Sequence, residues 1–542
     1  MMPRLRSASF LVGLAVFAGS LAVYVATLAP SLSWGWKGWG VDGGELLAAA
    51  NTFGVPHPPG YPTYMLLLRA FAEVVRVGDF AYRGNLFSAV CAAGALTLLY
   101  ASAFRLGRTL FPDAAPRVAA AGAALGAAVL GAAPVFWALS VVTEVYALNA
   151  LFCGALLHIA TRVTTRPPGE RPHSARYESA HLGLFGLLLG LGLGNHLTLL
   201  AVGVPLAYWM GFSVRWRWQR WAWAAGALAL GLCVYLYLPL RAGQHPPINW
   251  GGADSLGGVV WMLSGRPYQD YVFGVDASTL PSRLLDWLQL VFGQLNPLGI
   301  FIGLLGLGFL RVAERRLFEA VLATILLITA YAIAYNSFDF QVLTIPSFLV
   351  YGLAISLGLT WLVVEWLPRV IVPRPQPGKP RFSLAAYDPA LALIAATFVL
   401  LPVLSFSLNL DDQSLRDDRE AADLARRMMA EMPDGSVVLA GSETHVFPLW
   451  YETYVEQPER EVAVVATLLL QFVWYRRDLH EEFPDLVPAQ LPGDIDEAAR
   501  VILRHNLDGG RVYSTYTDRS LAQEFRVEGI GDLFQIKPLA EQ

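Results

Sequence analysis

The sequence predicts an α-helical polytopic membrane protein with a smaller soluble α/β domain at its C-terminal end. Of the 542 residues, 55% are hydrophobic and only 15% are charged, whereas about a quarter of a soluble protein is charged. Most apolar residues fall in runs long enough to cross a bilayer. Lys and Arg outnumber Asp and Glu by 26 to 17 in residues 1–408, but are outnumbered 13 to 26 in residues 409–542. This pattern excludes a purely cytosolic enzyme and a disordered chain.

Eleven apolar stretches are expected to span the membrane. They are residues 8–29, 84–104, 118–139, 142–161, 181–196, 197–213, 221–240, 286–310, 317–335, 346–367 and 386–408. The first is too long for the apolar region of a signal peptide and is followed by further spans, so we expect it to remain in the protein. Stretch 61–77 carries Arg69, Glu73 and Arg76 opposite an apolar side, which predicts a helix lying in the membrane interface.

Basic residues predict the orientation of the bundle. With a cytoplasmic N-terminus, 19 of the 26 Lys and Arg of residues 1–408 fall in inside loops, as the positive-inside rule requires. Counting 61–77 as a span would move the later basic loops outside. The acidic tail and the loops 30–83, 139–143, 241–285 and 336–345 are therefore expected outside. We expect a plasma (inner) membrane protein with a periplasmic or extracellular C-terminal domain.

Within residues 409–542, hydrophobic periodicity predicts alternating helices and strands. The expected elements are a helix over 414–431, a strand over 436–440, a helical stretch over 447–456, an apolar run over 461–470 and a helix–strand pair over 494–516. The Pro-rich segment 369–382 is expected to be an inside connector.

Several kinds of site are not expected. The three cysteines, Cys91, Cys153 and Cys233, all lie in apolar runs, which favours core positions over a disulfide framework or a metal cage. The chain has neither a glycine-rich phosphate loop nor a dinucleotide fingerprint. We therefore expect no nucleotide, no cofactor, no metal and no nucleic-acid partner.

Ionisable and amide side chains gather in five segments that the topology places on the outer side. Charged groups are costly at membrane depth, so such residues at span ends are candidates for function. A transporter would instead place polar groups near mid-depth, open to both sides. The candidates are Asp42, Glu45, His57, Tyr61, Glu144, Tyr146, Asn149, Asn195, His196, Arg241, Asn249, Trp250, Arg266 and Asp339.

Structural roles compete with functional ones at several of these positions. Asp42 followed by Glu45 matches a capping box at a helix start, a role that is compatible with catalysis. His57 lies between two prolines and fits a rigid turn. Arg241 could extend its side chain to lipid headgroups. Glu144 has no Lys or Arg near it in the sequence, which favours a functional role.

These motifs together resemble a known family. DGGEL (42–46), GVPHPPGYPTY (54–64), TEVYALN (143–149), GNHLT (194–198), YLPLR with PPINWGG (237–252) and YNSFDF with IPSF (335–348) are similar to the transmembrane O-mannosyltransferase-like family. That family resembles the GT-C superfamily of polyprenyl-phosphate-sugar glycosyltransferases, so a GT-C-like fold is implied. Segment 443–470 is similar to the family's post-membrane domain, but Ser442 to His445 depart from its usual motif.

The resemblance implies the function and the roles of the candidates. It implies an inverting glycosyltransferase that moves a sugar, mannose in particular, from a polyprenyl-phosphate lipid to a hydroxyl of an acceptor protein or glycan on the outer face. Asp42 matches the base in the first outer loop. Arg241, or secondly Arg266, would stabilise the leaving phosphate, and the remaining candidates would position the sugar and the acceptor.

Two other functions remain open from the sequence. One is a transporter or flippase of lipid-linked sugars, and the other is a membrane-anchored module whose acidic tail recruits a partner. The hypothesis of a membrane-anchored module predicts that removal of the tail abolishes function, whereas Asp42→Asn has no effect.

Overall fold

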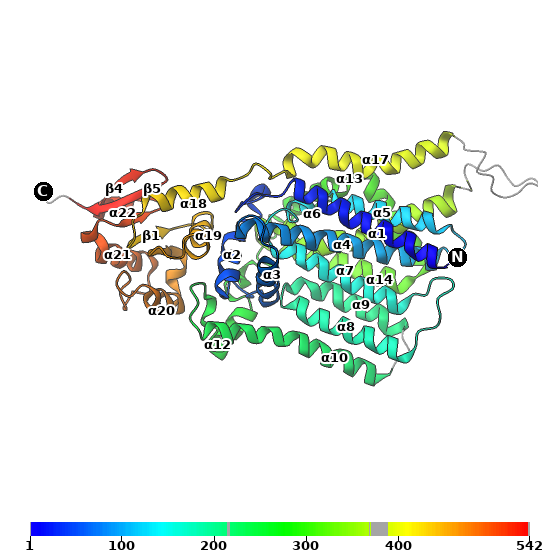
Figure 1. The fold of residues 1–542 in the computed structure, drawn as a ribbon, viewed down its shortest axis with the longest axis horizontal. Coiled ribbons are helices and arrows are strands. Elements are labelled where there is room, and N and C mark those ends of the chain that lie inside the picture. Colours follow the sequence, from blue (N-terminus) through cyan, green and yellow to red (C-terminus); the bar gives the residue numbers. More distant parts are fainter. Residues whose placement is uncertain (1, 214–216, 368, 370–388, 540–542) are drawn as a thin grey trace, which may run out of the picture.

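A helical bundle and a smaller α/β part make up the protein, which was analysed as a computed structural model (Figure 1). The structure describes residues 2–213, 217–367, 369 and 389–539. The predicted connector 369–382 lies outside the described residues except for position 369. The chain begins at one end of the bundle, and the α/β part lies beyond the opposite end (Figure 1).

Each of the eleven predicted spans coincides with one or two helices. The bundle helices are α1 (Met2–Ala26), α4 (Phe80–Leu110), α5 (Pro116–Gly131), α6 (Pro134–Ala138), α7 (Val145–Thr164), α8 (Ala175–Leu193), α9 (Leu200–Ser213), α10 (Trp218–Leu232), α11 (Tyr237–Ala242), α13 (Leu280–Ala313), α14 (Arg315–Ala334), α15 (Ile345–Trp361) and α17 (Pro389–Gln413). Within the described ranges, seven helical segments are long and apolar enough to cross a membrane, and two apolar helices are shorter. A count of eleven spans remains a prediction.

Glycines let the bundle helices approach closely. A Cβ on Gly306 of α13 would overlap the carbonyl oxygen of Ala354 on α15, and a Cβ on Gly358 of α15 would overlap that of Ile302. Gly190 of α8 and Gly231 of α10 meet in the same way. Small residues at such crossings are typical of membrane helices, because close contact replaces the hydrophobic driving force that lipid removes.

Two short helices follow the first span at the end of the bundle remote from the N-terminus (Figure 1). They are α2 (Gly43–Thr52) and α3 (Pro62–Val74), and α3 corresponds to the predicted interfacial stretch 61–77. Helix α3 buries Tyr64, Met65 and Leu68 but exposes Leu66 and Leu67. The loop after α11 adds α12 (Leu256–Leu263) to the same end.

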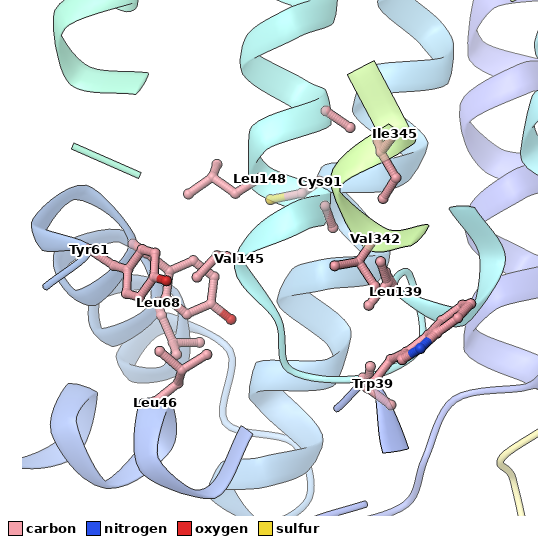
Figure 2. Close-up of a cluster of buried hydrophobic side chains, with 14 of the residues drawn as sticks. Trp39, Leu46, Tyr61, Leu68, Cys91, Leu139, Val145, Leu148, Val342 and Ile345 are labelled. Atoms are coloured by element: carbon pink, nitrogen blue, oxygen red, sulfur yellow. The ribbon is translucent and has the colours of Figure 1, made fainter. Parts of the chain in front are cut away.

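A shared apolar core fixes this end of the bundle (Figure 2). Trp39, Leu46 and Tyr61, which follow α1, pack with Val145 and Leu148 of α7, with Cys91 of α4, and with Val342 and Ile345 near the start of α15. Polar residues neighbouring these positions in the sequence are therefore anchored on packed elements.

The α/β part contains one five-stranded sheet in the order β2-β1-β3-β5-β4. Its strands are β1 (Ser436–Ala440), β2 (Val462–Ala466), β3 (Val512–Ser514), β4 (Phe525–Ile530) and β5 (Leu533–Pro538). Its helices are α18 (Glu420–Glu431), α19 (Glu443–Tyr451), α20 (Val473–Glu482), α21 (Ile495–Asn506) and α22 (Arg519–Glu524). Strand β1 pairs in parallel with β2 and β3, and β5 is antiparallel to β3 and β4.

The strand predicted over 436–440 is confirmed with the same limits. Both β1 and β2 are buried along their whole length, as expected of parallel strands covered on two faces. The sequence analysis missed the β4–β5 hairpin. The available signal was Gly531-Asp532 between two alternating runs, where Gly531 adopts φ 54° and permits a tight turn.

Helix α19 packs directly on α2 and joins the two parts of the protein. Gly44 makes this contact possible, because a Cβ there would overlap the carbonyl oxygen of Phe447. The Asn51 amide donates to the Tyr454 carbonyl at 3.0 Å, and the Tyr451 hydroxyl accepts from the Ala81 amide at 3.2 Å. The α/β part therefore packs on α2 and on the start of α4.

Candidate active site

Asp42, Glu45 and His57 form the centre of the candidate site. Glu45 is fully buried, and its carboxylate accepts hydrogen bonds from both the backbone amide of His57, at 3.1 Å, and the Nδ1 of its ring. The other ring nitrogen, Nε2, lies 3.7 Å from Oδ2 of Asp42. The Asp42 side chain makes no capping hydrogen bond to α2, so the predicted cap is not formed. With 35% of this side chain exposed, the Asp42 carboxylate is the member of the three that a substrate can reach.

Aromatic side chains surround His57. The Tyr61 hydroxyl lies 3.1 Å from Nε2 of His57, and the two rings meet edge-on. The rings of Trp250 and Tyr268 each lie 6.2 Å from the imidazole. Packing of this kind restricts rotation of the His57 ring, so its position relative to Asp42 is fixed by contacts on several sides.

The charges of these groups depend on one another. Burial lowers the pKa of His57, but the carboxylates of Glu45 and Asp42 outweigh it and raise that pKa to about 10, so the imidazole is a cation at neutral pH. Burial raises the pKa of Asp42, and although the His57 cation opposes this change, Glu443 and Glu45 add to it, bringing the pKa to about 7. A carboxylate that titrates near neutral pH is suited to accept and release a proton.

Glu144 and Asp339 add two more carboxylates near this centre. Glu144 precedes α7, is 3% exposed and accepts a hydrogen bond from the Val145 amide at 3.3 Å. Its charge acts on His57, and the charge of Asp339 acts on Asp42. The hydroxyl of Ser337 holds the Asp339 carboxylate. The structure therefore brings together carboxylates from three separate sequence motifs.

His196, Thr198 and Asn149 form a neighbouring polar network. Nδ1 of His196 accepts from the Thr198 hydroxyl at 2.8 Å and from the Thr198 amide at 3.3 Å, while the Asn149 amide donates to the same hydroxyl at 3.0 Å. These bonds leave the ring proton of a neutral His196 on Nε2. The Tyr146 ring lies 5.3 Å from the His196 ring. Asn195 is fully buried and donates to the Val145 carbonyl at 3.1 Å, which fixes the turn before α9.

Comparisons with known proteins relate this geometry to a family. Residues 42–220 match the family model of the protein O-mannosyl-transferase TMEM260 N-terminal domain. The protein O-mannosyl-transferase TMEM260 of Mus musculus is 32% identical over 209 residues, which cover 39% of this chain and 27% of the mouse protein. The protein of the same name from Dictyostelium discoideum is 26% identical over 203 residues, covering 36% of this chain and 23% of that protein.

Residues 42–220 are thus similar to the TMEM260 N-terminal domain. The chain spans only about a quarter of the length of the two curated relatives. The matched region contains nine of the fourteen candidates, from Asp42 to His196. The other five, Arg241, Asn249, Trp250, Arg266 and Asp339, lie beyond it.

Solved structures show the fold of the whole chain. ArnT from Cupriavidus metallidurans, bound to undecaprenyl phosphate, aligns with a TM-score of 0.57 at 12% identity over 98% of both chains. The oligosaccharyltransferase of Archaeoglobus fulgidus aligns with a TM-score of 0.51 at 14% identity, over 93% of this chain and 68% of that one. The chain thus has a GT-C fold, and it is a multi-pass membrane protein.

Arg241 does not reach the carboxylates. Its guanidinium donates to the carbonyl oxygens of Phe53, at 2.7 Å, and Thr52, at 3.2 Å. These residues lie at the C-terminal end of α2, whose N-terminal end carries Asp42. A ten-residue helix is about 15 Å long. The structure therefore shows Arg241 binding the C-terminal end of α2, where a cation is favourable, and its role on a donor phosphate remains a prediction.

Arg266 lies closer to the site. It begins the 3-10 segment Arg266–Tyr271, which also carries Tyr268, the residue that faces His57. Its exposed guanidinium donates to the Gln269 side chain at 3.0 Å. Arg266 is accordingly the better placed of the two arginines for a charged group that arrives at the site.

Asn249 and Trp250 lie where the helical bundle meets the α/β part. The Asn249 amide donates to Oδ2 of Asp478 on α20 at 2.9 Å. The Trp250 ring lies 6.0 Å from that of Trp474 and 6.2 Å from that of His57. Trp250 thus contacts the carboxylate centre, whereas Asn249 is directed to the α/β part.

The sequence analysis missed Glu443, which the α/β part contributes to the site. Glu443 lies in the first turn of α19, on the side of the molecule that packs against α2. Burial raises the pKa of Glu443, the His57 cation lowers it, and Glu45 and Asp339 raise it further. Its departure from the family motif argued against a role, but the Phe-Pro-Leu-Trp-Tyr run after it (447–451), which is similar to that motif, was an available signal.

One group of side chains among the described residues has the geometry to hold a metal ion. His245, Asp478 and Glu481 place their ligand atoms within 4.8 Å of one another. This group lies at the junction with the α/β part and shares no residue with the Asp42 centre.

Proposed function

We propose that this chain is an inverting glycosyltransferase that moves a sugar, mannose in particular, from a polyprenyl-phosphate lipid to an acceptor hydroxyl. The observation that carries the proposal is the Asp42 carboxylate, which is accessible, free of the helix cap and shifted to a pKa of about 7 beside a fixed His57 cation. The names of the two curated relatives support mannose and a protein hydroxyl.

The reaction requires one proton transfer and one displacement. The acceptor hydroxyl attacks the anomeric carbon, its proton passes to the Asp42 carboxylate, and the bond from that carbon to the phosphate oxygen breaks. Glu45 and His57 act as positioning residues, because the buried Glu45 holds the ring that faces Asp42. A base positioned within about 3 Å of the reacting oxygen contributes roughly 10²–10⁴-fold to the rate.

A lipid-borne donor fits the surface next to the site. On α12, Leu256, Val260 and Leu263 are 82%, 58% and 37% exposed and share one face by their spacing. An apolar face on a short helix at the end of the bundle suits contact with the membrane interface. Arg266 follows three residues after α12, where it would meet the phosphate of a lipid whose tail lies along that face.

The proposed arrangement places the site on the outer face of the membrane. The N-terminus and the site lie at opposite ends of the bundle (Figure 1), and the basic loops predict that the N-terminus is cytoplasmic. Residues 1–408 would then form the transmembrane domain, with residues 409–542 an extracytoplasmic domain. Glu45, Tyr61, Glu144, Tyr146, Asn149, Asn195, His196, Trp250 and Asp339 would position sugar and acceptor.

A transfer assay tests the proposal. The purified chain in lipid nanodiscs is incubated with radiolabelled polyprenyl-phosphate-mannose and a membrane extract, and the label is followed into protein, glycan or lipid. Asp42→Asn should retain donor binding and lower turnover by roughly two to four orders of magnitude. Asp113→Asn, at an exposed loop position outside the site, is the matched control. Label that crosses the bilayer without forming a new bond would instead indicate a flippase.

A further inference from the structure

A cavity of about 150 Å³ lies between the loop before α12 and the α/β part. Its walls include Trp250, Trp450, Trp474 and Tyr475, together with Asn249 and Asp478. A second, more open hollow of about 420 Å³ is lined by Gly251, Gly252, Ser255, Gly258 and Arg477, and Trp474 lines both. None of these positions belongs to the Asp42 centre except Trp250, which contacts His57.

The polar groups of this cavity offer both hydrogen-bond donors and acceptors. Asn249 and Asp478 are held together by the 2.9 Å bond from the amide to the carboxylate, and the Asp478 side chain is 14% exposed. Within the described residues, Oδ1 of Asn249 and the indole nitrogens of Trp250 and Trp474 have no hydrogen-bond partner. Buried polar groups without a partner are rare and costly, so the lining retains capacity to bind a polar ligand.

The charged side chains around the two hollows disfavour an anionic ligand. Arg477 is paired with Asp478 at 2.9 Å and with Asp254 at 3.6 Å, and His245 is paired with Glu481 at 3.0 Å. Both cationic side chains are therefore engaged by carboxylates, which disfavours a phosphate or carboxylate ligand. Aromatic faces combined with a fixed carboxylate and amide suit a ring that has apolar C–H faces and hydroxyls that both donate and accept.

We propose that this cavity is a saccharide subsite that binds one neutral hexopyranose ring. The ring stacks on the Trp474 face, and its hydroxyls bind Asp478 and Asn249. Because Trp250 contacts both the cavity and His57, the ring lies next to the reaction centre. It belongs either to the donor or to a glycan on the acceptor. The proposal concerns binding alone and does not require the transfer reaction.

Saturation-transfer NMR and calorimetry on the full chain in nanodiscs test this binding. Maltoside and glucoside detergents are avoided because they present the same chemistry. The probes are methyl glycosides of mannose, glucose, galactose and N-acetylglucosamine, for which a dissociation constant on the order of 1 mM is expected from ligand size. Asp478→Asn and Trp474→Phe should each weaken binding by roughly tenfold or more. Asp508→Asn and Trp218→Phe, at exposed positions away from the cavity, should leave it unchanged.

The two sources of the ring are separated by a second measurement. If the donor supplies it, Trp474→Phe weakens binding of polyprenyl-phosphate-mannose. If an acceptor glycan supplies it, donor affinity is retained and retention of a glycosylated acceptor falls. The proposal is overturned if no glycoside binds at tens of millimolar, or if the two cavity variants bind it as the controls do. Either result leaves the transfer activity through Asp42 to be judged separately.

Discussion

The raised pKa of Asp42 predicts how turnover depends on pH. A general base acts only when it is ionised. With a pKa of about 7, roughly one tenth of Asp42 is ionised at pH 6 and roughly nine tenths at pH 8. Turnover should therefore be lost as the pH falls through 7, with an approximately tenfold difference between pH 8 and pH 6. A carboxyl group with an ordinary pKa near 4 would give no change over this range.

Glu443→Gln provides a structural test of the origin of this pKa. Burial is the largest cause of the shift, and Glu443 is the largest of the carboxylates that raise it further. Removing that charge lowers the pKa of Asp42, so the acid limb of the profile should move to lower pH. Turnover at pH 6 should then rise relative to turnover at pH 8. Glu459→Gln, an exposed position on the same α/β part, is the matched control.

The assay is initial-rate sugar transfer in nanodiscs with saturating donor, measured between pH 5.5 and 8.5. Each variant is compared by its ratio of rates at pH 6 and pH 8, which cancels differences in protein amount. A profile that is flat across this interval would contradict a base with a pKa near 7 at position 42. A normal acid limb that does not move in Glu443→Gln would show that α19 does not act on the reaction centre.

Four other substitutions follow from the geometry. Gly44→Ala should lower turnover at least tenfold with the bundle still folded, because the new methyl overlaps the Phe447 carbonyl. Limited proteolysis of the α/β part would report the loosened contact between α2 and α19. Unchanged turnover would show that this contact is not needed for transfer. Arg266→Ala should raise the donor KM roughly tenfold, whereas Arg241→Ala should lower Tm and leave that KM unchanged; the reverse pattern would restore Arg241 to the donor. Glu144→Gln should lower kcat at normal protein yield, and a loss of folded protein would instead make Glu144 structural.

The sequence predicted most of the helices and the site residues that lie close together in the chain. It predicted fewer of the contacts between residues that are far apart in the sequence. Apolar runs predicted where the long bundle helices lie, because hydropathy acts within one segment. Asp42, Glu45 and His57 were found as one cluster because they lie within 16 residues. Asp42 does not cap α2 because its backbone is helical, with φ −70° and ψ −12°, whereas an N-cap residue is extended. Glu45, which would complete the capping box, is bound to His57 instead.

The positions of Arg241 and Glu443 relative to α2 could not be predicted from the sequence. Both lie far from Asp42 in the sequence, and each position depends on how one segment folds back on α2. Helix α11 puts Arg241 at the C-terminal end of α2, whereas the contact allowed by Gly44 puts α19, and with it Glu443, at the N-terminal end. The hydrophobic periodicity of a single segment does not predict which end of α2 that segment will contact.

In the proposed reaction, the residues around the base Asp42 differ from those that would stabilise the leaving phosphate. Glu45, Asp339 and Glu443 all raise the pKa of Asp42, and the cation that acts on it is His57, which is already held by Glu45. An anionic phosphate would be repelled by this group of carboxylates, so the charge that stabilises it has to come from outside the group. Arg266 meets that requirement, because it is exposed and follows the apolar face of α12. The acceptor would then approach Asp42 from the side of the α/β part, and the donor from the side of the membrane.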